Sequence, residues 1–250
     1  MTRPVDNIEY QTKALQIAKE TKKRIGIDKC SYLYNLSKYK PNLTISAKPL
    51  AKIFRKLNIV TNPGSSFINS KRYKEKKNTN FIAGNLLTKE FINSSNYKKI
   101  FSTDFTIIKH NKYGHLHILS SINVKNFYVP YIKISYKQSK ENVKDMIKKI
   151  DNIDILHSDN GAEFKSKDVI NYCLLKNIRQ SFSSPGCSVE NRWIEYFWGR
   201  LKMECLNHIK NISDLSIERI QDYLNDYVDY WNNKRPIKKF AYSTPSSLAK

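Results

Sequence analysis

The sequence predicts an α/β protein built on a mixed five-stranded sheet with flanking helices, preceded by a small basic all-α module. Two observations predict this fold class. From about residue 98 the apolar residues fall into short strand-like runs, and helical spacing returns after residue 139. Before residue 60, by contrast, the apolar residues keep only the three-to-four spacing of helices.

The first 60 residues are predicted to form a basic helical module. Segments 6–23 and 27–37 have loosely helical spacing, and segment 45–58 has a clear apolar stripe. The stripe consists of Leu50, Ile53, Phe54 and Leu57. The rest of that helix carries the basic residues that we predict to contact DNA, namely Lys48, Lys52 and Arg55. An ordinary solvated helix face is the alternative interpretation.

Three further parts are expected after this module. Residues 61–97 are polar and basic, which is typical of a linker that lies along a phosphate backbone. Residues 98–212 hold the alternating strands and helices, and we predict that they form the catalytic core. Residues 213–250 are predicted to be a C-terminal helix and tail.

The order of elements in the core indicates a particular α/β architecture. Three strands follow one another in hairpin succession, and helices and strands then alternate. The expected elements are strands 100–109, 115–122 and 127–134, helix 139–150, strand 153–157, helix 166–176, strand 178–183, and helices 188–209 and 214–233. This order is that of a ribonuclease-H-like domain, in which helices cover both faces of the sheet.

The charge balance favours a polyanionic partner. The chain has 44 Lys and Arg against 22 Asp and Glu, a formal net charge of +22. Such a surplus drives non-specific binding to nucleic acid, although a merely basic surface is the alternative. The four cysteines are scattered without a CxxC pair, which disfavours a zinc cluster or a disulfide framework. No run of 18 apolar residues occurs, so we expect a soluble, cytoplasmic protein that associates with the nucleoid when on DNA.

Three acids stand where a lone carboxylate would be unfavourable. Asp104 interrupts the apolar run from residue 100 to 108, and Asp159 closes the short run that begins at residue 155. Glu195 lies in an aromatic-rich helical pattern, with 35 residues between it and Asp159. In a mixed sheet the first and fourth strands are able to be neighbours, which would bring the two aspartates together.

A divalent metal would relieve the repulsion among these carboxylates. Magnesium prefers oxygen ligands and is held by one or two carboxylates plus substrate phosphate. Two such ions clamp the entering and leaving oxygens of a phosphoryl transfer. We therefore predict that Asp104, Asp159 and Glu195 are catalytic metal ligands. A solvated helix carboxylate is the alternative for Glu195.

Several neighbours of the acids have predicted roles. Lys202 lies two helical turns after Glu195, where it would meet a DNA phosphate, and an ordinary surface lysine is the alternative. Asn160 and Gly161 form a tight turn that holds Asp159 rigidly. His157 is interpreted as a structural or supporting residue rather than a general base. Glu163 is expected to be solvated, and an extra acid near the metals is the alternative.

The motifs resemble those of a known family. His157-Ser-Asp-Asn-Gly-Ala-Glu-Phe164 and Asn191-Arg-Trp-Ile-Glu-Tyr-Phe-Trp-Gly-Arg-Leu-Lys202 resemble the catalytic core of bacterial insertion-sequence DDE transposases with a retroviral-integrase-like core. The closest type is the OrfB product of the frameshifting insertion-sequence family. Tyr227-Val-Asp-Tyr-Trp-Asn-Asn-Lys-Arg-Pro236 is similar to the C-terminal signature of that group, and segment 27–58 to its helix-turn-helix-like region.

The resemblance implies magnesium-dependent cleavage and transfer of DNA strands, with two Mg²⁺ (or Mn²⁺) ions at the three acids. It also implies double-stranded DNA as partner, a homo-oligomer on the element ends, and an upstream-frame (OrfA) partner or fusion. Lys202 and Asn160 are expected to contact DNA. A ribonuclease-H-like nuclease that cuts without joining, or a non-catalytic DNA-binding regulator derived from a transposase, are the alternatives. The Asp159→Asn variant discriminates between the catalytic and the non-catalytic interpretation.

Overall fold

The computed structural model describes residues 4–21, 26–59, 85–94, 96–184 and 187–249. Much of the predicted linker, residues 60–84, lies outside the described residues. The chain forms two compact units. One comprises Met1–Lys77 with Pro236–Ser243, and the other Asn78–Arg235 with Thr244–Lys250. The division of the chain at residues 60, 97 and 212 stays a prediction.

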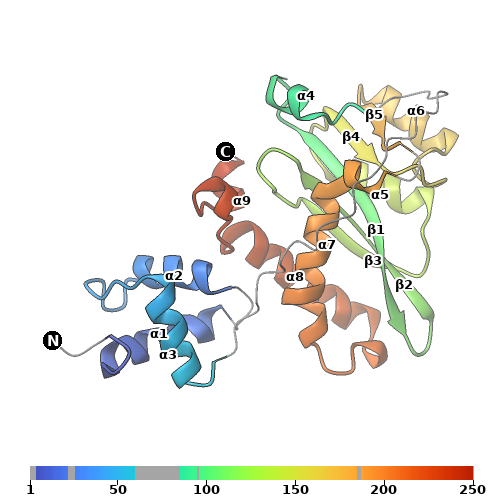
Figure 1. Cartoon of the computed structure of the whole chain (residues 1–250). Coiled ribbons are helices and arrows are strands. Elements are labelled where there is room, and N and C mark those ends of the chain that lie inside the picture. The colour runs from blue at the N-terminus through green and yellow to red at the C-terminus, as the bar shows by residue number, and fades with distance from the viewer. Residues whose placement is uncertain (1–3, 22–25, 60–84, 95, 185–186, 250) are drawn as a thin grey trace. The chain divides into compact units, whose positions relative to one another are not determined.

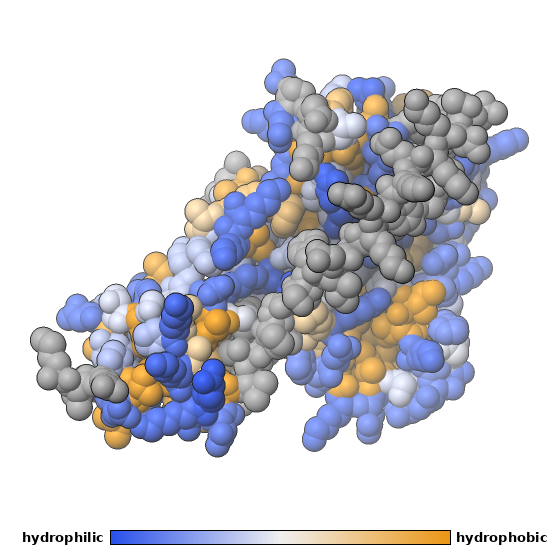
Figure 2. All heavy atoms as spheres, viewed as in Figure 1, coloured by the Kyte–Doolittle hydropathy of each residue, from blue (hydrophilic) through white to orange (hydrophobic). Residues whose placement is uncertain are grey.

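The N-terminal unit contains three helices, α1 (Ile8–Glu20), α2 (Ile27–Leu36) and α3 (Ala47–Lys56), shown in Figure 1. They are shorter than predicted. At the start of α1 the reason is the capping residue Asn7, whose side chain accepts a hydrogen bond from the backbone of Glu9. The predicted α3 stripe faces inward, with Leu50, Ile53 and Phe54 buried. Figure 2 shows hydrophilic residues interspersed with smaller hydrophobic patches over the visible face of this unit.

A segment far along the chain completes this unit. Residues 236–243, which include the short 3₁₀ helix η4 (Lys238–Phe240), pack with the N-terminal helices. The rings of Tyr32 on α2 and Tyr242 stack with their centroids 4.4 Å apart. The Lys238 ammonium also lies 3.9 Å from the carboxylate of Asp28.

The second unit is built on the predicted sheet, which confirms the fold class. Its strands are β1 (Ile100–His110), β2 (Gly114–Asn123), β3 (Tyr131–Ser135), β4 (Ile155–Ser158) and β5 (Arg179–Phe182). They lie in the order β3-β2-β1-β4-β5 (Figure 1). The first three pair antiparallel, while β4 pairs in parallel with both β1 and β5. The strand that carries Asp104 is therefore central, as expected.

The third strand starts later than predicted. The strand expected at 127–134 begins only at Tyr131, because the residues before it form a turn. Phe127 has a positive φ of 63°, and the Asn123 side chain accepts hydrogen bonds from the backbone of Lys125 and Asn126. Pro130 then has no N–H to donate to a strand partner.

Helices cover both faces of the sheet. On one face, α5 (Lys140–Lys149) and α6 (Lys167–Leu175) pack over a common apolar core. Ser139 caps α5 through the backbone N–H of Asn142, as predicted. On the other face lie α7 (Arg192–Glu204) and α8 (Ile217–Asn233) (Figure 1). The shorter helices of this unit are α4 (Lys89–Ser94), α9 (Pro245–Leu248), and the 3₁₀ helices η1 (Ser188–Asn191), η2 (Leu206–His208) and η3 (Ile212–Asp214).

The long helix predicted over 188–209 is divided into three pieces. Only Arg192–Glu204 is α-helical, and η1 and η2 flank it. The helix begins at Arg192 because its N-cap residue, Asn191, is tied to β1 by its side chain. It ends before Cys205, whose backbone angles of φ −130° and ψ −71° leave the helical region. The predicted apolar stripe is nevertheless buried, from Ile194 to Leu201.

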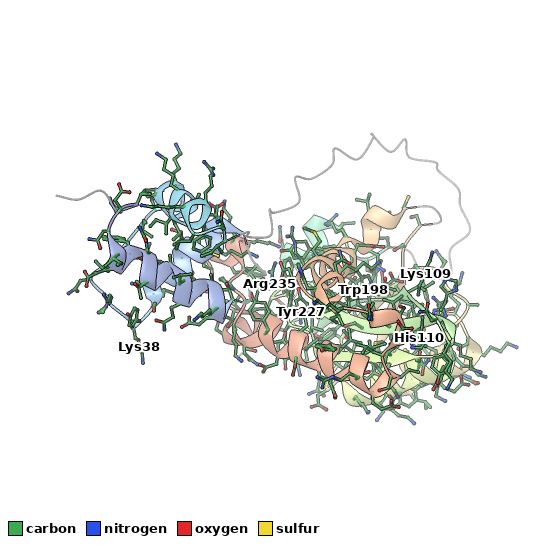
Figure 3. The ribbon with its side chains drawn as sticks, turned by 90° about the horizontal axis from the view of Figure 1, so that it is seen from below. Lys38, Lys109, His110, Trp198, Tyr227 and Arg235 are labelled. Atoms are coloured by element: carbon green, nitrogen blue, oxygen red, sulfur yellow. The ribbon has the colours of Figure 1, made fainter. Side chains whose placement is uncertain are left out.

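A fully buried ion pair joins the end of α7 to the end of α8. Arg235 Nε and Nη2 each donate a hydrogen bond of 2.7 Å to the Glu204 carboxylate. The Tyr227 hydroxyl donates to the same carboxylate at 3.0 Å, and the Arg235 guanidinium lies 4.5 Å from the centre of the Trp231 ring. Figure 3 shows Tyr227 and Arg235 within this part of the unit. The pair fixes the helix that carries Glu195.

Across the described residues, no helix has both the length and the apolar character that a membrane crossing requires.

Candidate active site

The strand register brings the two predicted aspartates together. β1 and β4 run parallel, with Ser102 opposite His157. Two residues after Ser102 on β1 is Asp104, and two residues after His157 is Asp159, which directly follows β4. The parallel register therefore places Asp104 alongside Asp159. Because side chains alternate between faces with a period of two, both aspartates project on the face that carries Ser102 and His157.

The start of α7 is anchored beside Asp104. The buried Asn191 side chain donates a hydrogen bond of 3.1 Å to the backbone oxygen of Thr103, and it accepts one from the Ser102 hydroxyl. Both partners lie on β1 just before Asp104. Glu195 follows Asn191 by about one helical turn and is exposed, so the third predicted acid is brought to the same strand.

The electrostatics of Asp104 show that the three acids interact. Burial in the first place, and then the negative charges of Asp159 and Glu195, raise the pKa of the Asp104 carboxyl to about 7. Hydrogen bonding to the Phe105 backbone and to Trp198 acts in the opposite direction. Three carboxylates within electrostatic reach of one another are the arrangement that a cation would stabilise.

The three acids interact electrostatically, but they are not gathered around one point. Among the residues that the structure describes, no three or more His, Cys, Asp or Glu side chains are placed to hold a metal. The donor set nevertheless fits magnesium, since all three groups are carboxylates. The acidic neighbours of Asp104 also destabilise its ionised form, which a bound cation would relieve. Asp104, Asp159 and Glu195 are the residues that would hold it.

The turn after β4 is built around Gly161. Its backbone N–H donates a hydrogen bond of 3.0 Å to Asp159 Oδ1. A Cβ at this position would stand 2.6 Å from Glu163 Oε1 and 3.1 Å from Asp159 Oδ1, so a side chain there would crowd both carboxylates. Glu163 was expected to be solvated, but it is half-buried and its carboxylate rests against this turn. The acidic surroundings of Asp159 therefore include Glu163, which was the alternative interpretation of this residue.

Asn160 and His157 are both engaged within the fold. The Asn160 amide donates to the backbone oxygen of Ser183 and accepts a hydrogen bond of 3.0 Å from Lys165. The His157 ring is buried between the hydroxyls of Ser181 and Ser183, at 2.8 and 3.1 Å. Burial lowers the pKa of His157 to about 4, which keeps the ring neutral. A DNA contact by Asn160 stays a prediction.

The predicted basic DNA contacts are exposed. Lys202 lies on the exposed side of α7, in its last turn. Lys48, Lys52 and Arg55 lie on the exposed side of α3, opposite its buried stripe. Their contacts with DNA stay predictions.

Two residues beside the acids were missed by sequence reasoning. Asn191 was identified only as the first residue of a motif, and Trp198 only as an apolar residue of the long helix. A signal for Asn191 was available, because Asn is a preferred N-cap residue four positions before Glu195. No sequence signal marks Trp198 as a residue that affects the pKa of Asp104.

The raised pKa of Asp104 predicts how stability depends on pH. Between its ordinary value of 3.8 and about 7, the folded chain retains a proton that the unfolded chain has released. The free energy of unfolding of the metal-free chain should therefore fall as pH rises through this interval, by on the order of 4 kcal/mol from this group. Guanidinium unfolding at a series of pH values would measure it.

The matched control is Asp104→Asn, which removes the titrating group and keeps its shape. The difference in unfolding free energy between the natural chain and this variant should change steadily from about pH 4 to pH 7 and then level off. A difference that is independent of pH would contradict the raised pKa.

Comparison with known proteins identifies the family. Two integrase core domain profiles match residues 96–188 and 176–245, which together are more than half of the chain. The chain is 34% identical over 93 residues to InsK, a transposase of insertion sequence element IS150 from Escherichia coli (strain K12); these are 36% of this chain and 31% of InsK. It is 28% identical over 159 residues to a transposase-like protein from Haemophilus influenzae (strain ATCC 51907 / DSM 11121 / KW20 / Rd), with 62% and 71% coverage.

The fold is shared with a solved integrase core. The HTLV-2 integrase catalytic core domain, in complex with magnesium and in dimeric form, aligns with a TM-score of 0.50 at 15% identity. The alignment covers 61% of this chain and 97% of that domain. At this identity the likeness shows the fold alone.

The chain belongs to the integrase core domain family. The relatives to which it is similar are named as transposases or as transposase-like. The match spans about a third of the length of InsK.

Proposed function

We propose that this chain cleaves DNA at the ends of an insertion sequence and joins the freed 3′-hydroxyl to another strand. The observation that supports it most directly is the register that sets Asp104 beside Asp159, with Glu195 brought to the same strand by Asn191. Acidic residues that converge on one face of a ribonuclease-H-like sheet suit phosphoryl transfer. The family and the relatives support the same activity.

The three acids would hold magnesium or manganese, as two ions. Bound there, the metal would stabilise the entering and leaving oxygens of an in-line displacement. In the cleavage step a water oxygen bonds to phosphorus and the bond from phosphorus to the 3′ oxygen breaks, which leaves a 3′-hydroxyl. In the joining step that hydroxyl releases its proton to solvent as its oxygen bonds to the phosphorus of a second phosphodiester. The bond from that phosphorus to its own 3′ oxygen breaks, and the displaced 3′ oxygen takes up a proton from solvent.

The chain's own residues position these groups. The Asp159 side chain is held by the Gly161 N–H, and the Asn160 amide ties the same turn to Ser183 beyond β5. Lys202 would contact a DNA phosphate from the exposed side of α7, and the basic side of α3 would contact a second DNA segment.

The partners follow from this activity. Double-stranded DNA is the proposed substrate, and a homo-oligomer would hold two element ends together. An upstream-frame product, as partner or fusion, would add recognition of the ends. We place the protein in the cytoplasm, on the nucleoid when it is bound to DNA.

A cleavage and joining assay tests the proposal. Labelled duplexes of the DNA that flanks the coding frame on either side are incubated with the chain in magnesium, in manganese and in excess EDTA. We expect nicked and joined products in either metal and neither in EDTA. Nicked products without joining would favour the nuclease, and DNA binding without any product would favour the non-catalytic regulator.

A further inference from the structure

Asn191 joins the helix that carries Glu195 to the strand that carries Asp104. Its buried side chain makes two hydrogen bonds to β1: the amide donates at 3.1 Å to the Thr103 backbone oxygen, and the oxygen accepts from the Ser102 hydroxyl. Ser102 and Thr103 are themselves completely buried. Buried polar groups that lose their partner are costly, so this connection is firmly held in the folded chain.

The Asn191 side chain does not cap its own helix. Asparagine is favoured at the N-cap because its side-chain oxygen accepts a hydrogen bond from the backbone of the first turn. Asn7 caps α1 in this way, whereas Asn191 stands at the N-cap of α7 without such a bond. Its hydrogen-bonding groups are directed to β1 instead. The stability of α7 by itself therefore does not explain this residue, but its connection to the strand does.

The helix runs along β1 in the direction of the strand. It starts beside Ser102 and Thr103. The segment after the helix contacts the far end of β1, where the Asn111 backbone N–H donates at 2.9 Å to the Ser213 oxygen. The courses of α7 and β1 can be followed in Figure 1. The two elements therefore advance together from the connection at Asn191.

The spacing along the two elements matches. Asp104 lies two residues after Ser102, a rise of about 6.6 Å along a strand. Glu195 lies four residues after Asn191, a rise of about 6 Å along an α-helix. The connection between Ser102 and Asn191 therefore carries both acids forward by nearly the same distance. A helix that began one residue earlier or later would turn Glu195 by about 100° about the helix axis.

We infer that Asn191 is a positioning residue, which together with Ser102 sets the place of Glu195 relative to Asp104 for metal binding. This inference rests on the proposed metal-dependent function. Asn191 acts through the start of α7, and Ser102 acts through β1. Residues that orient metal ligands commonly affect metal affinity by roughly tenfold to a hundredfold.

Manganese binding to the whole chain tests the inference. Free Mn²⁺ is measured by electron paramagnetic resonance during titration of the natural chain and of Asn191→Ala, which removes both hydrogen bonds to β1. We expect the affinity of the variant to be lower by roughly tenfold or more.

The matched control is Asn232→Ala. Asn232 on α8 is similarly buried, and its side chain also makes two hydrogen bonds, of 2.8 and 3.0 Å, with the backbone of Val129. This variant therefore loses the same kinds of contact at a place away from the three acids. It should lower stability to a similar extent and leave the manganese affinity unchanged.

Hydrogen exchange of the metal-free chain gives an independent measurement. Loss of the connection to β1 frees the start of α7. In Asn191→Ala the backbone amides of residues 193–196 should therefore exchange roughly tenfold faster relative to those of β2. In Asn232→Ala this ratio should stay as it is in the natural chain.

The outcomes separate the two proposals. If the natural chain binds no Mn²⁺, the proposed function fails, while a raised exchange ratio would still show that Asn191 fixes the helix. If the natural chain binds Mn²⁺ and Asn191→Ala binds it equally well, the positioning role is wrong. Equal losses of affinity in the Asn191 and Asn232 variants would also overturn it, because they would reflect general destabilisation.

Ser102→Ala covers the case in which Asn191→Ala does not fold. It removes only the hydroxyl that donates to Asn191 and keeps the bond to Thr103. We expect a smaller loss of manganese affinity, of roughly threefold to tenfold. In the double variant the second change should add little, because Ser102 and Asn191 share one bond. Natural affinity in Ser102→Ala would overturn the inference.

Discussion

Replacing Asp159 by Asn should lower strand cleavage in magnesium by at least about a thousandfold. Loss of one carboxylate charge removes several kcal/mol of transition-state stabilisation by metal, and about 4 kcal/mol corresponds to a factor of a thousand. The fold should be preserved, because the Asn oxygen is able to accept the hydrogen bond that Gly161 donates to Asp159 Oδ1. Denaturing gels of the labelled duplex would measure the cleavage rate.

The control for this variant is Asp226→Asn, which neutralises an exposed carboxylate on α8. We expect it to cleave at the natural rate. Binding to duplex DNA should be nearly the same in both variants, since the basic residues are untouched. Undiminished cleavage by Asp159→Asn would refute the assignment of this aspartate as a metal ligand.

Replacing Arg235 by Met should lower the free energy of unfolding by about 3–5 kcal/mol. The change leaves the Glu204 carboxylate buried without its bidentate partner, and uncompensated buried charge is strongly destabilising. Guanidinium unfolding followed by tryptophan fluorescence would measure the loss. All three tryptophans, at positions 193, 198 and 231, lie in the second unit, so the signal reports on that unit.

The double variant Glu204→Leu with Arg235→Met tests whether the loss of stability comes from the unpaired Glu204 charge or from lost side-chain packing. Since buried ion pairs are commonly replaceable by apolar groups at little cost, the second change should restore most of the lost stability. The exposed pair between Lys140 and Asp168 is the matched control, and Lys140→Met should leave the free energy of unfolding nearly unchanged. A single Arg235 variant as stable as the natural chain would show that the pair does not hold α7 in place.

Much of the site was predictable because its geometry follows from sequence periodicity. An acid inside an apolar strand and an acid directly after a second strand are visible along the chain, and the parallel register places them side by side. The order of strands and helices indicated the sheet for the same reason. The positions of Asp104 and Asp159 are visible in the sequence, and the two carboxylates come together as soon as β1 and β4 are neighbouring strands.

The supporting residues were not predictable, because their roles depend on contacts between distant segments. The segment from Tyr227 to Pro236 was identified only as a signature, whereas in the structure Tyr227 and Arg235 hold the last residue of α7. The orientation of the Trp198 indole is also a tertiary property. The third strand was predicted too early because a strand-like pattern does not show that Asn123 closes a turn with a left-handed residue at Phe127.

The return of residues 236–243 to the N-terminal helices has a consequence for synthesis and for truncation. A ribosome releases the first helices long before the segment that stacks Tyr242 on Tyr32, so this unit is incomplete until residues 236–243 have been made. A fragment that ends at residue 77 would lack residues 236–243 permanently. Anyone who wants the basic unit by itself should graft the late segment onto it rather than shorten the gene.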